Sequence, residues 1–226
     1  AIVYTSGTTG RSKGAMLTHG NLASNAGVLH SYWRFRPGDV LLHMLPIYHV
    51  HGLFVAIHCA LLSGSPMLFE PRFDAERAME LLPKATVFMG VPTYYVRLLA
   101  ERDFGKRLCA HMRLFISGSA PLLPETFSEF RERTGHTILE RYGMTEGGMF
   151  SSNPYDRERR GGTVGFPLPG TDIRVMDDAG HPVKCGEVGN IQVKGANVFI
   201  GYWQMPEKTR EEFTSDGYFK TGDMGQ

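Results

Sequence analysis

Short apolar runs alternate with segments of helical periodicity along the first 160 residues of the chain. The apolar runs predict strands at Ala1–Tyr4, Asp39–Met44, Ser65–Glu70, Ala85–Met89, Arg113–Ile116 and Thr137–Arg141. The periodic segments predict helices at Gly20–Tyr32, Gly52–Ser63, Asp74–Leu82, Pro92–Glu101 and Pro124–Thr134. Strands that alternate with helices favour right-handed crossovers and a parallel sheet. We therefore predict an α/β fold with layered, mostly parallel sheets and helices.

The pattern changes after about Arg160, where glycine- and proline-rich loops begin. Short strands are expected at Asp172–Met176 and Gly189–Val193, and the turn Asp177–Gly180 between them indicates antiparallel pairing. We expect residues 1–160 to form the α/β part of one domain and residues 161–226 to form a small C-terminal β-rich subdomain of it.

Composition narrows the function classes. A net charge of +1 gives no reason to expect nucleic-acid binding. Gly52–Ser63 is apolar nearly all round, as a buried helix would be, and its longest apolar run is too short for a membrane span. Three widely separated cysteines argue against a disulfide framework or zinc site. We expect a reducing compartment, which is the cytoplasm or, in a eukaryote, an organelle matrix.

The segment Thr5–Gly14 follows the first predicted strand and is rich in hydroxyl side chains and glycine. Glycine lets the backbone approach a ligand closely, and the loop N–H groups and hydroxyls can donate to phosphate oxygens, with Lys13 adding a positive charge. A Walker A loop would need glycine where the chain has Ser12 and a hydroxyl residue where it has Gly14. A surface loop without chemistry is the other interpretation. We favour a polyphosphate site.

Polar or glycine-rich segments also follow most of the other predicted strands. They are His49–His51, Val91–Thr93, Ser117–Ala120 and Tyr142–Glu146. Because ligands of open α/β sheets bind outside the carboxyl ends of the strands, we expect these segments to share one site with the phosphate loop.

Thr145 and Glu146 are the expected partners of the phosphate loop. Mg²⁺ prefers hard oxygen ligands, typically a carboxylate together with substrate phosphates, so Glu146 could bind the metal and Thr145 could donate to phosphate. A solvated acid at a helix N-terminus is the alternative for such a pair. Asp223 could accept hydrogen bonds from two ribose hydroxyls.

Four motifs occur together in order and approximate spacing. They are Thr5–Gly14, Tyr142–Glu146, Gly165–Gly170 and Tyr218–Asp223. In this arrangement the chain resembles the adenylate-forming acyl-CoA synthetases, whose superfamily includes luciferase and peptide-synthetase adenylation domains. The resemblance implies an enzyme that uses Mg²⁺ and ATP to convert a carboxylate to an acyl-adenylate. The acyl group then passes to the thiol of coenzyme A.

The resemblance also implies roles for individual residues. Those that match the family's β/γ-phosphate loop are Thr5, Ser6, Gly7, Thr8, Thr9, Gly10 and Lys13. Those that match the segment lining the adenine and acyl sites are Ser117, Gly118, Ser119 and Ala120. Tyr142, followed by Gly143, matches the aromatic residue against the adenine, Thr145 the α-phosphate contact, Glu146 the magnesium ligand and Asp223 the ribose ligand. Lys13, Thr145 and Glu146 are the expected catalytic residues.

The family also has elements that this chain lacks. They are the helices and strands before the phosphate loop and, after it, a further arginine, a hinge and a mobile C-terminal lid domain whose lysine completes adenylation. We therefore expect the chain to be a piece of a longer enzyme, truncated before the hinge, and to be poorly active or inactive alone.

Two arginines bear on the identity of the acid. Arg97 lies one helical turn after Thr93, and Arg141 directly precedes the Tyr142 motif. Two guanidinium groups could clamp a second substrate carboxylate, with His51 bordering the site. The chain looks most similar to malonyl-CoA synthetases in the segments Leu139–Glu146, His49–Leu53 and Ser117–Leu122, and this resemblance implies malonate as the acid.

Other interpretations of these arginines stay open. The two side chains could instead pair with Glu101 and Glu140. A medium-chain or aryl acyl-CoA synthetase is then the alternative enzyme. A nucleotide-binding relative without catalytic activity is the alternative from another class.

Overall fold

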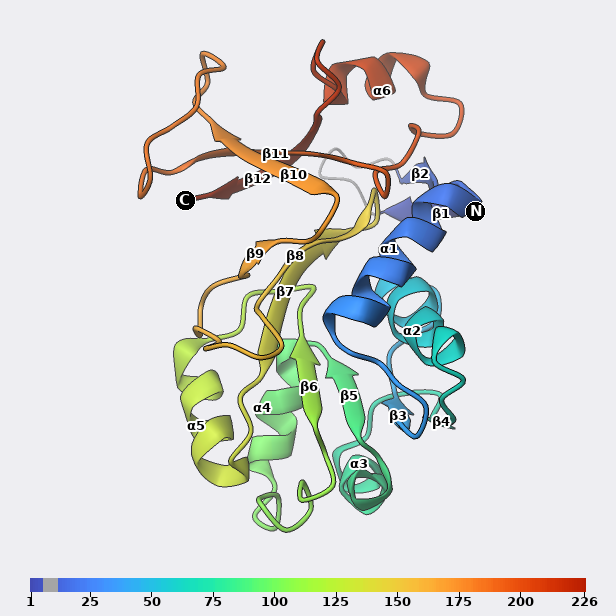
Figure 1. Ribbon diagram of the computed structural model, residues 1–226, viewed down its shortest axis with the longest axis vertical. Coiled ribbons are helices and arrows are strands. Elements are labelled where there is room, and N and C mark those ends of the chain that lie inside the picture. Colours follow the sequence, from blue (N-terminus) through green and yellow to red (C-terminus); the bar gives the residue numbers. More distant parts are fainter. Residues whose placement is uncertain (6–11) are drawn as a thin grey trace.

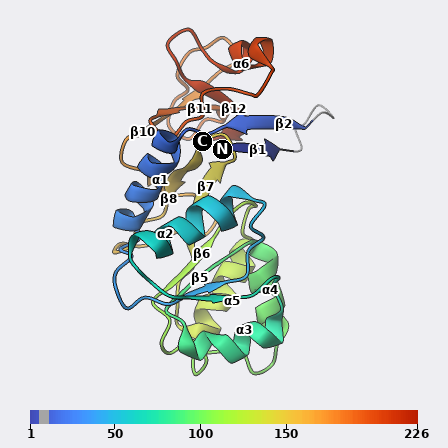
Figure 2. The same ribbon diagram turned by 90° about the vertical axis from the view of Figure 1, so that its right-hand side faces the viewer.

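The computed structural model describes residues 1–5 and 12–226, and its larger region is built on a seven-stranded sheet (Figures 1 and 2). The strand order is β4-β3-β5-β6-β7-β8-β9. The strand bounds are β3 Leu41–His43, β4 Met67–Phe69, β5 Val87–Gly90, β6 Leu114–Ser117, β7 Leu139–Met144, β8 Gly148–Ser152 and β9 Phe166–Pro167. The strands from β4 to β7 are parallel, and β8 and β9 add to the edge in antiparallel pairs.

Helices cover both faces of this sheet. On one face lie α1 His19–Tyr32, the π-helix η1 His51–Ala56 and α2 Ile57–Leu62, and on the other lie α3 Ala75–Leu81, the short 3₁₀ helix η2 Leu82–Lys84, α4 Pro92–Ala100 and α5 Pro124–Thr134. Along β5, Val87 and Met89 join the core on the first face and Phe88 joins the core on the second. Burial on both faces explains why these strands read as continuous apolar runs.

A smaller antiparallel region lies at one end of the molecule (Figure 1). Its three-stranded sheet consists of β10 Thr171–Met176, β11 Gly189–Gly195 and β12 Phe219–Gly225. The hairpin of β1 Ile2–Thr5 and β2 Lys13–Met16 lies beside it, as does helix α6 Pro206–Glu212. A third core that includes Ala15, Phe150, Tyr202 and Phe219 joins the hairpin, the large sheet and the small sheet.

Most of the predicted elements are confirmed, including two helix ends. Asp74 caps α3 by accepting a 2.9 Å hydrogen bond from the Arg77 N–H, and α5 ends at Gly135, whose φ of 78° is in the left-handed region that glycine tolerates. The expected antiparallel pair of β10 and β11 is also confirmed. The large sheet extends beyond Arg160, because β9 still pairs with β8.

Other expectations were wrong. Leu61 and Leu62 at the end of α2 are exposed, so Gly52–Ser63 is not buried all round, and its first part is a π-helix. β2 was not predicted, and its pairing with β1 means that Lys13 begins a strand instead of lying within a loop. β7 continues to Met144, because pairing with β8 extends it past the expected end at Arg141.

Candidate functional site

Lys13 and Glu146 meet at the side chain of Tyr202. The Tyr202 hydroxyl donates a 2.8 Å hydrogen bond to Glu146 Oε1, and Lys13 Nζ lies 4.7 Å from the centre of the Tyr202 ring. Lys13 comes from β2, whereas Glu146 lies in the turn between β7 and β8. The structure thus brings together the two charged residues that the sequence assigns to phosphate and magnesium.

The electrostatics of this group suit a polyphosphate and its cation. Glu146 is 4% exposed, and burial raises the pKa of its carboxyl, while the Tyr202 hydrogen bond and the charge of Lys13 act in the opposite direction. Burial and the nearby Glu146 carboxylate also raise the pKa of Tyr202. A buried carboxylate is a hard oxygen donor, so Glu146 fits the chemistry of a magnesium ligand.

Backbone pairing fixes where Lys13 lies. The Trp203 N–H donates to the Gly14 carbonyl at 2.8 Å, and the Met16 N–H donates to the Gly201 carbonyl at 2.9 Å. β2 is therefore joined both to β1 and to the loop that carries Tyr202.

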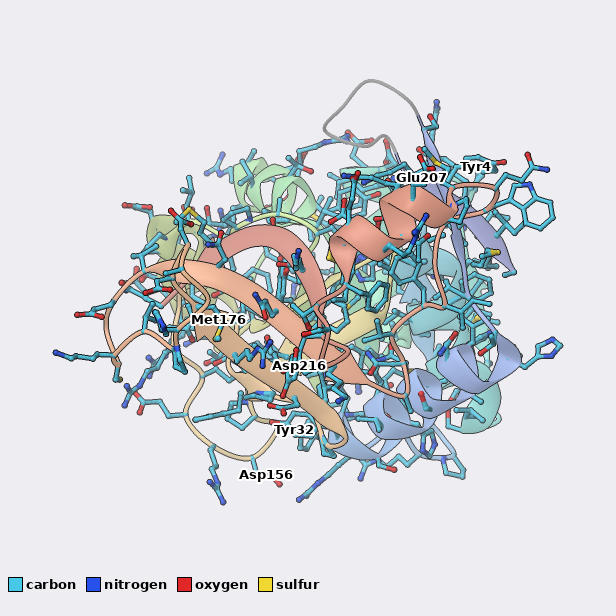
Figure 3. The ribbon with its side chains drawn as sticks, turned by 90° about the horizontal axis from the view of Figure 1, so that it is seen from above. Tyr4, Tyr32, Asp156, Met176, Glu207 and Asp216 are labelled. Carbon is cyan, nitrogen blue, oxygen red and sulfur yellow. The ribbon has the colours of Figure 1, made fainter. Side chains whose placement is uncertain are left out.

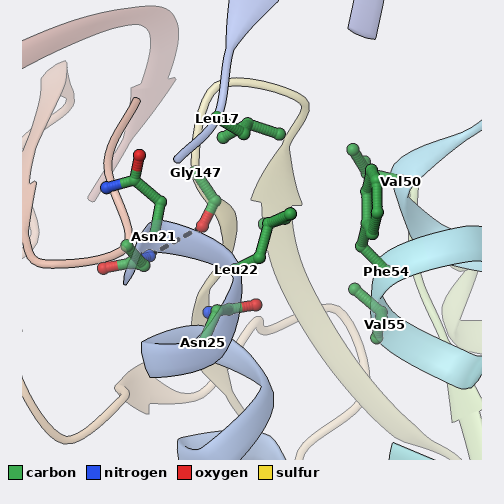
Figure 4. A pocket seen from close by; sticks show the side chains of 10 residues that line it. Leu17, Asn21, Leu22, Asn25, Val50, Phe54, Val55 and Gly147 are labelled. Carbon is green, nitrogen blue, oxygen red and sulfur yellow. Dashed lines mark hydrogen bonds between the residues drawn. The ribbon is translucent and has the colours of Figure 1, made fainter. Parts of the chain in front are cut away.

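Buried asparagines fix the turn that carries Glu146. Asn197 Nδ2 donates to the Gly147 carbonyl at 2.7 Å, and Asn25 Nδ2 donates to the Met149 carbonyl at 2.8 Å. Figure 4 shows the small, mainly apolar pocket behind this turn, lined by α1 residues such as Leu22 and by Phe54 of η1. These contacts hold Glu146 at the carboxyl end of β7.

Tyr142 and Asp223 form a second group. The Tyr142 hydroxyl donates a 2.5 Å hydrogen bond to Asp223 Oδ2, joining β7 of the large sheet to β12 of the small one. Burial and then this hydrogen bond raise the pKa of Tyr142, and the charge of Glu146 also contributes. The structure therefore places the predicted adenine and ribose residues in contact with each other and close to Glu146.

A third group consists of His51 at the start of η1, Ser119 in the loop after β6 and Arg141 in β7. Ser119 Oγ is 3.3 Å from His51 Nδ1, and both His51 and Arg141 are buried. Arg141 Nε and Nη2 and His51 Nε2 have no hydrogen-bond partner among the described residues. Burial lowers the pKa of Arg141 to about 9, and burial followed by the charge of Arg141 lowers the pKa of His51 well below its usual value.

Unpartnered donors of this kind are expensive to bury. An anionic ligand would satisfy them, which makes this group suitable for a carboxylate. The predicted alternative, a pair between Arg141 and Glu140, is not observed, because a Glu140 carboxylate oxygen accepts from the Gly162 N–H at 3.0 Å instead.

Gly118 makes room for the Arg141 guanidinium. A Cβ at position 118 would lie 2.5 Å from Arg141 Cζ. The next residue, Ser119, has a φ of 68°, which is unusual for a residue other than glycine and common at ligand sites. The Ser117–Ala120 segment is therefore shaped around the arginine.

Arg97 lies elsewhere. Its exposed guanidinium lies 4.9 Å from the centre of the Phe73 ring, and the structure gives no contact from it to His51 or Arg141. Thr145 is half-buried in the β7–β8 turn, and Thr5 ends β1. Ser6, Gly7, Thr8, Thr9 and Gly10 lie outside the described residues.

Three residues of the site were missed by sequence reasoning. Tyr202 and Glu212 approach Lys13, and His43 at the end of β3 is buried with its ring against Phe69. Burial lowers the pKa of His43 to about 4. None of the three belongs to a motif, and only their folded positions reveal them.

A family model described as "AMP-binding enzyme" matches residues 1–203 of the chain. The chain belongs to this family. Among curated relatives, it is 42% identical to the mitochondrial malonate–CoA ligase ACSF3 of Mus musculus, and the match covers 98% of this chain and 44% of that protein. It is 41% identical to the malonate–CoA ligase of Arabidopsis thaliana, and the match covers 100% of this chain and 40% of that protein.

Two solved structures have the same fold as this chain. ATP-bound MatB from Rhodopseudomonas palustris matches with a TM-score of 0.98 and 58% identity, covering 100% of this chain and 45% of that one. A malonyl-CoA ligase with methylmalonyl-CoA and AMP bound matches with a TM-score of 0.91 and 41% identity, and the match covers 99% of this chain and 49% of that one. The α/β fold is therefore confirmed, and the chain spans less than half the length of these relatives.

Proposed function

We propose that the protein containing this chain is an ATP-dependent acid–CoA ligase that forms AMP and diphosphate, with malonate as its acid. The observation that carries the ligase assignment is the meeting of Lys13 and Glu146 at Tyr202, close to the Tyr142–Asp223 pair. Two groups of opposite charge beside an aromatic residue and a ribose-type carboxylate fit a nucleoside triphosphate with its cation.

Each residue has a role that follows from its chemistry. Attack of a carboxylate on the α-phosphorus joins two anions, so the site must neutralise charge and align the reactants. Lys13 binds the β/γ-phosphates, Thr145 the α-phosphate, Tyr142 the adenine and Asp223 the ribose. Mg²⁺ supplies further charge neutralisation when bound, and Glu146 is the side chain that would hold it. Coenzyme A is the acyl acceptor.

The choice of malonate rests mainly on Arg141. Its buried guanidinium lies next to His51, and its Nε and Nη2 have no hydrogen-bond partner in the part of the chain that the structure describes. Such a group suits the second carboxylate of a small diacid and not the apolar chain of a fatty acid. The relatives named as malonate–CoA ligases support the same acid. Arg97 stays a proposed second contact, although its exposure predicts a smaller contribution.

The location of the protein is also a proposal. In the described part of the chain, no helix combines the length and apolarity that a membrane crossing requires. We infer a cytoplasmic or organelle-matrix location, which is supported by relatives that carry the word mitochondrial in their names.

AMP formation by the full-length protein tests the proposal. The protein would be incubated with ATP, Mg²⁺, coenzyme A and one of malonate, methylmalonate, octanoate or coumarate. We expect AMP with malonate well above the other acids. AMP with octanoate and none with malonate would instead support a medium-chain enzyme, and ATP binding without AMP from any acid would support a non-catalytic relative.

A further inference from the structure

Lys13 forms an ion pair with a carboxylate other than Glu146. Its Nζ lies 3.7 Å from Glu212 Oε1, and the two side chains are 11% and 19% exposed. Neither group is freely solvated, so their attraction is screened less than that of an ordinary surface pair. The lysine expected to bind the phosphates is therefore engaged within the protein.

Helix α6 places Glu212 there. The Tyr202 N–H donates to Thr209 Oγ1 at 2.9 Å, and Lys220 Nζ donates to the Glu211 carbonyl at 2.9 Å, which ties the helix to the Tyr202 loop and to β12. Figure 1 shows α6 above the β1–β2 hairpin and the small sheet, and Figure 3 looks down on α6 from above. The geometry of the Lys13–Glu212 pair is thus built into the packing of α6.

Glu212 also has a second cation. Lys208 Nζ lies 3.0 Å from Glu212 Oε1, closer than Lys13 does. If Lys13 moved to a phosphate, Glu212 would still be paired, so no carboxylate would be left without a counter-charge. Exchange of Lys13 from a carboxylate to a phosphate oxygen therefore costs little more than the loss of one ion pair.

We propose that Glu212 is a positioning residue that holds Lys13 in the nucleotide-free protein and yields it to the β/γ-phosphates. This inference rests on the proposed function, because it requires a triphosphate at Lys13. Glu212 competes with the phosphates for Lys13 and its charge repels them. Glu212 therefore weakens the binding of nucleotides that reach Lys13, and it favours the departure of diphosphate by taking the lysine back.

The test compares two nucleotides that differ only in the phosphates Lys13 would contact. Calorimetric binding of ATP and of AMP would be measured on the full-length protein, for the wild type, Glu212→Gln and Glu211→Gln. We expect Glu212→Gln to bind ATP about threefold to tenfold more tightly. AMP affinity should stay within about twofold, because AMP lacks these phosphates.

Glu211→Gln is the matched control. It removes the same charge one residue away, and Glu211 contacts Lys208 at 3.2 Å instead of Lys13. We expect it to leave both affinities within about twofold. Unchanged AMP binding in both variants also shows that they are folded.

A second background tests whether Glu212 acts through Lys13. In Lys13→Met protein, Glu212→Gln should tighten ATP binding by less than half of its fold-change in the wild type. An equal fold-change in both backgrounds would overturn the inference. So would weaker or unchanged ATP binding in Glu212→Gln, or an equal change for ATP and AMP. A wild type that binds AMP and ATP alike without a preference for the triphosphate would overturn it too, whereas a wild type that binds neither would overturn the proposed function and this inference with it.

Discussion

The two ends of the candidate site differ in whether their charges have partners within the protein. At the phosphate end, Lys13 faces Glu212 and Glu146 accepts from Tyr202. At the acyl end, Arg141 and His51 are buried with unpartnered nitrogens among the described residues. A paired group must be released to bind its ligand, whereas an unpartnered group gains its first partner from the ligand. We therefore expect the acyl end to select the acid and the phosphate end to serve every acid alike.

Glu146→Gln changes the phosphate end of the site and should have the largest effect on activity. Loss of the carboxylate that would hold Mg²⁺ should lower the rate of adenylation about 1,000-fold, by analogy with the loss of one preorganised electrostatic contact. Because we expect Glu146 to act at the phosphate end and not on the acid, malonate and any slow alternative acid should lose activity in proportion. Single-turnover AMP formation would measure this, and a loss confined to malonate would contradict the division of the site.

Arg141→Leu should break the acyl end. Removing the guanidinium should lower kcat/KM for malonate about 100-fold, because a buried partner of a charged group is lost. Since Arg141 Nε and Nη2 have no hydrogen-bond partner among the described residues, the same change should leave the thermal unfolding midpoint unchanged or raised. Steady-state kinetics would measure the loss of kcat/KM, and thermal unfolding would measure the midpoint. A strongly destabilised variant would show that Arg141 has a structural role that its unpartnered nitrogens do not predict.

His43 should make the stability of the protein depend on pH. Its pKa of about 4 in the folded protein lies below the usual value of 6.5, so the unfolded chain binds the proton first as the pH falls. Stability is therefore lost between pH 6.5 and about pH 4, by about 1 to 2 kcal/mol at pH 5. Denaturant unfolding at pH 7 and pH 5 would measure the loss, and His43→Leu should reduce it. The same pH dependence in both proteins would assign it to other groups, such as His51.

Arg97→Ala should have the smallest effect. The side chain is exposed and packs over Phe73, so kcat/KM for malonate should fall only about fivefold, and activity with octanoate should change less than that. Kinetics with both acids would measure the difference. A loss as large as that of Arg141→Leu would show that Arg97 enters the acyl end when the acid binds.

Local patterns predicted the elements well, because their causes are local. The caps at Asp74 and Gly135 and the apolar strands of the parallel sheet depend on residues close in sequence. The β1–β2 hairpin and the extension of β7 depend on partners chosen by tertiary pairing. The four residues of β2 are too few to show the alternation of apolar and polar side chains that would predict that pairing.

The residues of the candidate site also fall into those that the sequence predicts and those that only the fold reveals. Lys13, Tyr142, Glu146 and Asp223 could be assigned because they lie in motifs. Tyr202, Glu212 and His43 could not, because their importance arises from contacts or burial that only the fold creates. The isolation of Arg97 from Arg141 was equally hidden, since helical spacing gives the face of α4 but not what packs against it.

Malonate-dependent exchange of labelled diphosphate into ATP by the full-length protein tests the central claim most directly. The reaction needs the phosphate end and the acyl end at once, and it does not need coenzyme A. We predict rapid exchange with malonate that depends on Mg²⁺ and is nearly abolished in both Glu146→Gln and Arg141→Leu. Exchange that is absent with malonate, or that persists in Arg141→Leu, would contradict the account.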